Sequence, residues 1–219
     1  MKQYLQSSIG KKQIVAITGL ALVLFLIAHL SGNLLFFKGP EAINNYSKFL
    51  KDLGAGLWIA RLGLIGAFVL HVAFIIILTI QNKKARSYSY LKPLHPKTRK
   101  LTTQLMRLSG LFLFVYVGVH LYDFTFTPHT DLNSTIDGEY LGLYGHMVTY
   151  LKSPIRSIFY ILAMISVSLH LAHGVHSVVQ TMGFNHPRYT PLAKKTANVI
   201  SLLLGLGFSS VPIYILFFL

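Results

Sequence analysis

The chain of 219 residues contains no cysteine, and it has few charged residues, only six of which are acidic. Without cysteine it forms no disulfide, binds no Cys-ligated iron–sulfur cluster and has no thiol nucleophile of its own. Charged residues make up 12% of the chain, about half the share usual for a soluble globular protein. Gly54-x-Gly56 lacks a third glycine and follows no strand pattern, so the dinucleotide-binding fingerprint is absent. These absences argue against a soluble protein and exclude thiol chemistry.

Apolar residues make up 53% of the chain and gather in long runs. The first run, Gln13 to Phe37, contains no Asp, Glu, Lys or Arg, and about 20 apolar residues are enough to cross a bilayer. It is too long for the core of a signal peptide, so we expect a retained helix. The sequence predicts an all-α integral membrane protein, a single transmembrane domain over 1–219 whose bundle of five transmembrane helices spans about 13–37, 57–81, 105–127, 155–181 and 196–219.

The net charge of +14 could indicate a nucleic-acid partner, but the basic residues lie between the apolar runs. The connections after the second and fourth runs carry Lys and Arg without any acid, whereas the connection after the third holds three acids and one lysine. This bias predicts a multi-pass protein of the cytoplasmic membrane with its N-terminus in the cytoplasm. We also expect an amphipathic helix within 40–56 on the outer interface and a turn-rich loop at Pro93 and Pro96. We find no internal repeat.

Six of the ten histidines lie inside the predicted spans, where ionisable residues indicate a functional site. The first four spans carry at least one histidine each, and the fifth carries none. From the rise of an α-helix, His29 and His120 lie about 24 and 22 Å above the cytoplasmic end of their spans. His71 and His170 lie about 15 and 16 Å above it. The histidines therefore form two pairs at two depths.

Two histidines on facing helices are the axial ligand set of a haem, and cofactors of this kind sit in bundle cores. A neutral imidazole binds the metal through one nitrogen, while the other can donate to a neighbouring carbonyl. Small residues near the four histidines would let a flat macrocycle approach: Gly32, Gly66, Gly118 and Gly174. We expect His173 and His176 at helix contacts or beside haem propionates, and the loop residues His95, His129, His146 and His186 to be solvated.

Two other interpretations use the same histidines. Each could simply make a hydrogen bond between helices, as polar side chains in membranes do. Alternatively, His170, His173 and His176, spaced three apart, could bind a divalent cation in a metal transporter. Such a site usually recruits carboxylates, and the spans offer only Asp123 near an outer end.

Several segments resemble the cytochrome b membrane subunit of succinate dehydrogenases and fumarate reductases, in its single-chain, five-helix, di-haem form. The matching segments are Phe25-Leu-Ile-Ala-His29-Leu-Ser-Gly-Asn33, Phe68-Val-Leu-His71, Arg107-Leu-Ser-Gly110, Val119-His120-Leu-Tyr122 and His170-Leu-Ala-His-Gly174. The resemblance covers nearly the whole chain. It implies two haem b groups, one on His29 and His120 and the other on His71 and His170. It also selects His170 over His173, because the family has a histidine four residues before a glycine.

The resemblance further implies partners and a reaction. A cytoplasmic iron–sulfur subunit and a flavoprotein subunit would oxidise succinate or reduce fumarate, so this chain would serve as the electron-transfer and quinone-reactive subunit without itself acting on succinate or fumarate. The quinone could be menaquinone or ubiquinone, and the basic segments 83–100 and 188–195 are candidate docking surfaces or lipid-binding segments. Membrane subunits of hydrogenases and formate dehydrogenases are the nearest alternative.

Four further residues are candidates for this chemistry. Asp123 lies three residues beyond His120 on the same side of the helix, so it could accept protons at a quinone site or be a solvated helix-end acid. Arg61 and Arg156 begin spans on the outer side, and Arg107 begins one on the inner side. Each arginine could bind a haem propionate or anchor its helix at the interface.

Overall fold

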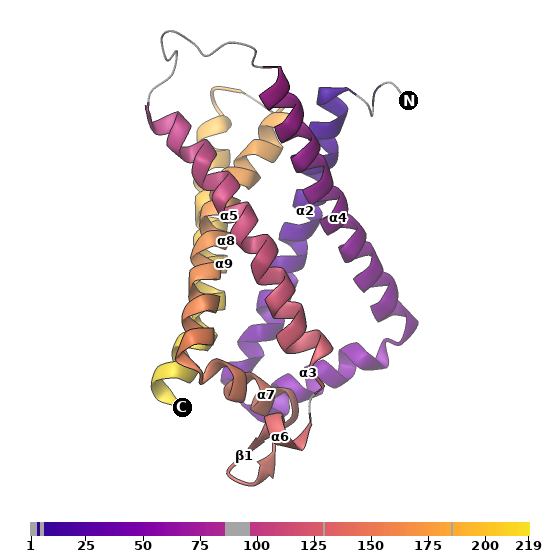
Figure 1. The fold of residues 1–219 in the computed structure, drawn as a ribbon, viewed down its shortest axis with the longest axis vertical. Helices are drawn as coiled ribbons and strands as arrows, with labels where there is room; N and C mark the ends of the chain where they lie inside the picture. The colour runs from indigo at the N-terminus through magenta and orange to yellow at the C-terminus, as the bar shows by residue number, and fades with distance from the viewer. Residues whose placement is uncertain (1–3, 5–6, 86–96, 129, 185) are drawn as a thin grey trace.

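The computed structural model describes residue 4 and residues 7–85, 97–128, 130–184 and 186–219. Five long helices run along the molecule (Figure 1): α2 (Ser8–Asn33), α4 (Ala55–Lys84), α5 (Lys97–Leu121), α8 (Pro154–Thr181) and α9 (Thr190–Phe218). The shorter elements are the 3₁₀-helix η1 (Leu34–Lys38), α3 (Pro40–Asp52), the π-helical turn η2 (Tyr122–Phe126), α6 (Asp131–Ser134), strands β1 (Thr135–Ile136) and β2 (Glu139–Tyr140), and α7 (Gly142–Leu151).

The five predicted spans are confirmed as five helices long and apolar enough to cross a membrane. All five begin earlier than the hydropathy pattern predicts, and α2, α5 and α9 do so by five residues or more. Helix α2 begins at Ser8, because the Ser7 hydroxyl accepts a hydrogen bond from Gly10 N at 3.0 Å and caps the first turn. Helix α9 begins at Thr190, with Pro191 in its first turn, where the missing N–H of proline costs nothing. The loop predicted at Pro93 and Pro96 lies outside the described residues.

The outward faces of these helices are apolar. On α4, which packs mainly against α2, Ile59 is 72% exposed and Leu62 is 64% exposed. On α8, Ile155 is 82% exposed. Water would penalise such continuous apolar surface, whereas acyl chains would cover it. The length, hydropathy and exposure of the helices together indicate a multi-pass integral membrane protein.

The two ends of the bundle differ in charge. We call the end where α2, α5 and α9 begin and α4 and α8 end the basic end, and the opposite end the capped end. Counted along the sequence, the segments that lead into and join the helices at the basic end contain 14 of the 20 lysines and arginines and none of the six acids. The other six basic residues share the capped end with all six acids. The net charge of +14 is therefore concentrated at the basic end, because the six basic and six acidic residues at the capped end cancel.

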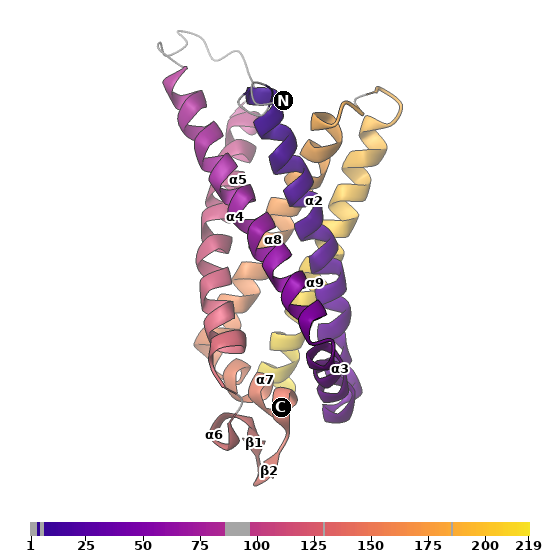
Figure 2. The same cartoon turned by 90° about the vertical axis from the view of Figure 1, so that its right-hand side faces the viewer.

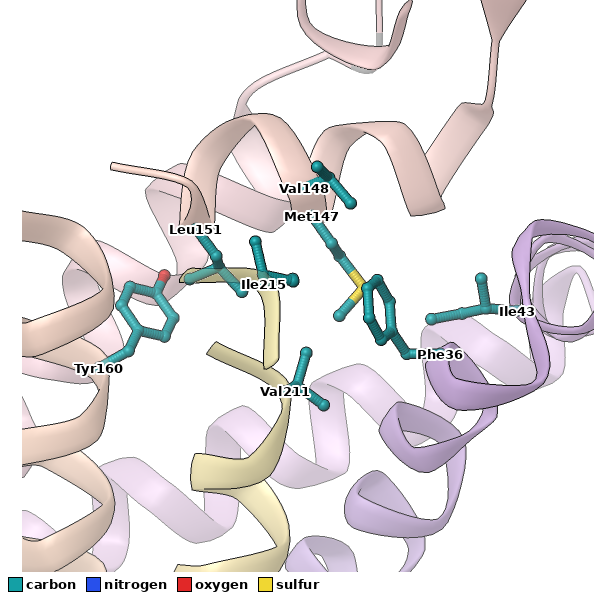
Figure 3. Close-up of a cluster of buried hydrophobic side chains, with 8 residues drawn as sticks. All are labelled: Phe36, Ile43, Met147, Val148, Leu151, Tyr160, Val211 and Ile215. Carbon is teal, nitrogen blue, oxygen red and sulfur yellow. The ribbon is translucent and has the colours of Figure 1, made fainter. Parts of the chain in front are cut away.

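The capped end is closed by short elements, as Figure 2 shows from the side. The amphipathic segment predicted within 40–56 is confirmed as α3, which buries Ile43. The β1–β2 hairpin turns through Asp137 and Gly138, both with positive φ, as a two-residue turn of type I′ requires. Side chains from η1, α3, α7, α8 and α9 form the core beneath this cap (Figure 3): Phe36, Ile43, Met147, Val148, Leu151, Tyr160, Val211 and Ile215.

Helices α8 and α9 pack at close range in the middle of the bundle. The Ser168 hydroxyl donates to Ser201 O at 2.9 Å across this interface. A methyl group added at Gly205 would lie 1.9 Å from the Ser168 hydroxyl oxygen. Glycine at this position allows the two backbones to approach, as small residues do between membrane helices. Helices α5 and α2 pack against α8 of this pair.

Candidate functional site

His71 of α4 is held by the backbone of α2. Its Nδ1 lies 3.1 Å from Val15 O and 3.2 Å from the Thr18 hydroxyl oxygen. A carbonyl oxygen can only accept, so Nδ1 carries the proton and donates it, and Nε2 presents its lone pair. Gly19 allows this approach, because an added Cβ would lie 3.1 Å from His71 Cε1. His71 is therefore fixed in the tautomer that a metal ligand needs.

His170 of α8 is held in the same way by α5. Its Nδ1 lies 3.3 Å from the Ser109 hydroxyl oxygen, and that hydroxyl already donates to Met106 O at 3.1 Å. The hydroxyl oxygen therefore accepts from Nδ1, and Nε2 of His170 is again the nitrogen with a free lone pair. A Cβ at Gly110 would lie 3.2 Å from His170 Cε1. His71 also acts on His170 electrostatically, which places the two histidines in the same region of the bundle; we call them the first layer.

These two arrangements share a short local pattern. Thr18-Gly19 on α2 and Ser109-Gly110 on α5 each pair a hydroxyl with a glycine, and each is followed by a histidine ten residues after the glycine. These histidines are His29 and His120. Ten residues of helix rise about 15 Å, so each helix receives a neighbour's histidine at one level and supplies its own at a second. This separation between the two levels is larger than the one obtained from the depths counted from the predicted span ends.

His29 and His120 form the second layer, across α2 and α5. Their ring centroids are 5.8 Å apart. A metal ion bound between the two rings would take one nitrogen from each, since metal–imidazole bonds are about 2 Å long. His120 Nδ1 is buried and has no hydrogen-bond partner among the described residues. A buried nitrogen without a partner is costly, and either coordination or a partner supplied with a cofactor would remove that cost.

The rings around the second layer are aromatic. Phe25 stacks on His29 with centroids 5.2 Å apart, and Tyr116 stacks on His120 at 5.6 Å. Phe208 of α9 lies 5.7 Å from the His29 ring. Such a flat, apolar surrounding suits a macrocycle, whose faces and edges are largely apolar. The described residues therefore fit a bis-histidine haem site at His29 and His120, and His71 and His170 offer the nitrogen donors that a second site would need.

The glycines near the histidines play different parts from those expected. Cβ atoms added at Gly66 and Gly118 would meet nothing within 4 Å, so open space lies beside both glycines. Gly32 does not leave such room, because a Cβ there would lie 2.5 Å from the Tyr46 ring of α3. At Gly174 a Cβ would meet the Met106 methyl at 3.8 Å. Gly32 and Gly174 therefore serve helix packing.

His173 and His176 lie on α8 beyond His170, toward the basic end. His173 is within electrostatic range of both neighbours, and His176 is also within range of Lys194. His176 Nε2 is buried without a hydrogen-bond partner in the described part of the chain. Among the described residues, no three His, Asp or Glu side chains come together as a metal site. The described residues thus do not supply the three-ligand site that a metal transporter needs.

Asp123 is buried, with 1% of its surface exposed, so of its two alternatives the solvated helix-end acid is wrong. Its Oδ2 accepts a hydrogen bond from the Tyr160 hydroxyl at 2.9 Å, and its Oδ1 lies 3.6 Å from Arg156 Nη2. The Tyr160 ring lies 6.1 Å from the His120 ring. A polar chain therefore leads from the half-exposed Arg156 through Asp123 to Tyr160, whose ring contacts the second histidine layer.

The π-helical turn η2 creates a place for His146 beside Asp123. Thr127 N donates to Tyr122 O at 3.0 Å, five residues back, so the Asp123 carbonyl does not receive the N–H it would bind in an α-helix. His146 Nε2 donates to Asp123 O at 2.7 Å instead. His146 lies on α7 and is fully buried, so its assignment as a solvated loop residue is wrong. The sequence pattern missed it because α7 is a short helix within a connection.

The three candidate arginines lie in different surroundings. Arg156 is engaged with Asp123 and lies over the Tyr150 ring at 4.3 Å. Arg61 lies over the ring of Trp58 at 5.3 Å on the exposed face of α4, as an interfacial anchor would. Arg107 is exposed at the basic end of α5.

Comparison with known proteins adds no assignment to this geometry. No protein-family model, curated protein or solved structure matches the chain.

Proposed function

We propose that the chain is the di-haem cytochrome b membrane anchor of a succinate:quinone oxidoreductase, either a succinate dehydrogenase or a fumarate reductase. The main observation that supports this proposal is the arrangement of four histidines in two pairs. His71 pairs with His170 and His29 pairs with His120, and each of the four comes from a different helix. The alternative of unrelated interhelical hydrogen bonds does not account for an unpartnered buried nitrogen on His120.

In this proposal the four histidines hold two haem b groups, each of which supplies reversible one-electron transfer when bound. His71 and His170 would offer Nε2, because Val15 O and the Ser109 hydroxyl fix the proton on Nδ1. Thr18 and Ser109 would set the ring orientations and raise the basicity of the ligands. The apolar bundle around each layer would exclude water.

The basic end would face the cytoplasm, as the charge difference between the two ends favours. It would dock an iron–sulfur subunit that carries a flavoprotein subunit, because the chain has neither cysteine nor a dinucleotide motif. The chain would thus pass electrons between that partner and quinone in the cytoplasmic membrane, while succinate or fumarate chemistry takes place on the partner. His173, His176 and Arg107 lie toward this end, where the propionates of the first layer's haem would need partners.

Quinone would react near the capped end, where Asp123, Tyr160 and Arg156 lead from the surface to His120. Quinone reduction couples electrons to protons, so a buried carboxylate with a hydroxyl donor is a suitable proton site. The Tyr160 hydroxyl, 2.9 Å from Asp123 Oδ2, would pass or hold the proton.

The first test is a reduced-minus-oxidised absorbance spectrum of the purified chain with haem quantification. We expect two haem b groups per chain, without covalent attachment, since the chain has no cysteine. A colourless protein that binds zinc stoichiometrically would refute the proposal and favour a transporter.

The second test uses the pairing of the ligands. His29→Ala and His120→Ala should each remove the same haem component in a redox titration, and His71→Ala and His170→Ala should each remove the other. His173→Ala should retain both haems, with shifted potentials. Loss of one common component from His29→Ala and His71→Ala would contradict the two-layer arrangement.

The third test concerns partners. Gentle solubilisation should co-purify a flavoprotein and an iron–sulfur protein, with succinate–quinone or fumarate–quinol activity. Recovery of a hydrogenase or formate dehydrogenase instead would reject this complex while leaving the haem assignment in place.

A further inference from the structure

An open cavity of about 270 Å³ lies at the basic end, between the first turns of α2 and the last turns of α8. It is lined by Ile9, Lys12, Ser177, Gln180 and Thr181. The site therefore combines one ammonium, two hydroxyls and one amide with an apolar side chain, Ile9, that is 64% exposed. This composition suits a ligand that has an anionic head beside an apolar part.

The charge around the cavity has no counterpart within the chain. The neighbouring Lys11 is directed elsewhere, since its Nζ donates to Gln81 Oε1 of α4 at 3.1 Å. Lys12 faces the cavity, and all six acidic residues of the sequence belong to the capped end. An anion bound beside Lys12 must therefore come from outside the chain.

The position of the cavity indicates which kind of molecule supplies that anion. The cavity lies where two membrane-spanning helices reach their polar ends, the level at which phospholipid headgroups lie. Basic pockets between helices on the cytoplasmic side are suited to anionic headgroups. Free phosphate is also an anion, but it has no apolar part that would contact the exposed Ile9.

We infer that this cavity binds the phosphate headgroup of an anionic phospholipid. The Lys12 ammonium pairs with the phosphate, the hydroxyls of Ser177 and Thr181 and the Gln180 amide donate to its oxygens, and Ile9 contacts the start of an acyl chain. The inference is independent of haem and of the quinone reaction.

The test is native mass spectrometry of the full chain released from nanodiscs of phosphatidylcholine that contain one-fifth phosphatidylglycerol. The unmodified chain should retain phosphatidylglycerol selectively. Lys12→Gln should weaken this retention about fivefold, the effect expected for one lysine at an anionic surface. Ser177→Leu should weaken it as well, by filling the cavity without changing any charge. Circular dichroism of each variant establishes that it is folded.

Lys84→Gln is the matched control, because it removes the same charge from the exposed end of α4 at the basic end, away from the cavity lining. It should retain phosphatidylglycerol as the unmodified chain does. Equal losses in Lys84→Gln and Lys12→Gln would overturn the inference in favour of diffuse surface attraction, as would full retention in Ser177→Leu. Displacement of the lipid by millimolar inorganic phosphate would overturn it in favour of a free-phosphate site.

Discussion

The hydrogen bond from Tyr160 to Asp123 allows a prediction whose size follows from burial. Tyr160→Phe removes the hydroxyl 2.9 Å from Oδ2 of a carboxyl group that is 1% exposed. A hydrogen bond to a charged group contributes about 1.5–3 kcal/mol. At about 2–4 °C per kcal/mol for a chain of this size, the midpoint of thermal unfolding should fall by about 3–12 °C.

Arg156→Gln removes the other partner of the carboxylate and should cost less. The Arg156 side chain is 41% exposed and its Nη2 lies 3.6 Å from Oδ1, so water screens the pair, and such pairs contribute about 0–1 kcal/mol. A larger loss of thermal stability in Tyr160→Phe than in Arg156→Gln would therefore show that the buried hydrogen bond, and not the ion pair, holds Asp123.

The assay is thermal unfolding of the chain in nanodiscs, followed by circular dichroism. A double-mutant cycle supplies the control, because Tyr160→Phe should cost little when Asp123→Ala has already removed the acceptor. Two results would refute the reasoning: a larger loss from Arg156→Gln than from Tyr160→Phe, or an equal loss from Tyr160→Phe with and without the Asp123 carboxylate.

Three further predictions concern other parts of the bundle. If His71 and His170 hold a haem as proposed, Thr18→Val and Ser109→Ala should each shift its potential or weaken its retention about 10–100-fold, while the haem proposed on His29 and His120 is unchanged in a redox titration. Gly205→Ala should destabilise the chain by about 1–3 kcal/mol, because the added methyl would lie 1.9 Å from the Ser168 hydroxyl oxygen. Gly63→Ala, whose methyl meets nothing within 4 Å, is its control in the same thermal assay. His146→Leu should destabilise the capped end by about 1–3 kcal/mol, the cost of leaving the Asp123 carbonyl buried without its donor, and faster proteolysis within 122–151 should reveal it.

The spans could be predicted from the sequence because a bilayer demands long apolar runs, and that requirement needs no tertiary information. The pairing of His29 with His120 also followed from the helix rise. Helix ends were less predictable, since capping by Ser7 and the proline in the first turn of α9 act over single turns. These local effects extended α2 and α9 beyond their apolar runs.

The capped end could not be predicted in detail, because its elements are too short to show a period. Helix α6 has four residues and each strand has two. The burial of His146 and Asp123 depends on α7 folding back onto η2, which is a tertiary contact between distant segments. The Thr18-Gly19 and Ser109-Gly110 pattern was present in the sequence, but its meaning emerged only from the histidines that approach it from α4 and α8.

The widened turn η2 has a consequence for insertions and deletions. Its five-residue closure from Thr127 N to Tyr122 O places one more residue in that turn than an α-helix would hold. A single deletion within Tyr122–Phe126 would let the helix close regularly, but it would rotate everything on one side by about 100° relative to the other. After deletion of Phe124, Thr125 or Phe126, the residue four positions after Asp123 would be Pro128, which has no N–H, so the helix would offer the Asp123 carbonyl no donor. The rotation would also separate that carbonyl from His146, which now donates to it. Chain length in this segment is therefore constrained as tightly as side-chain identity.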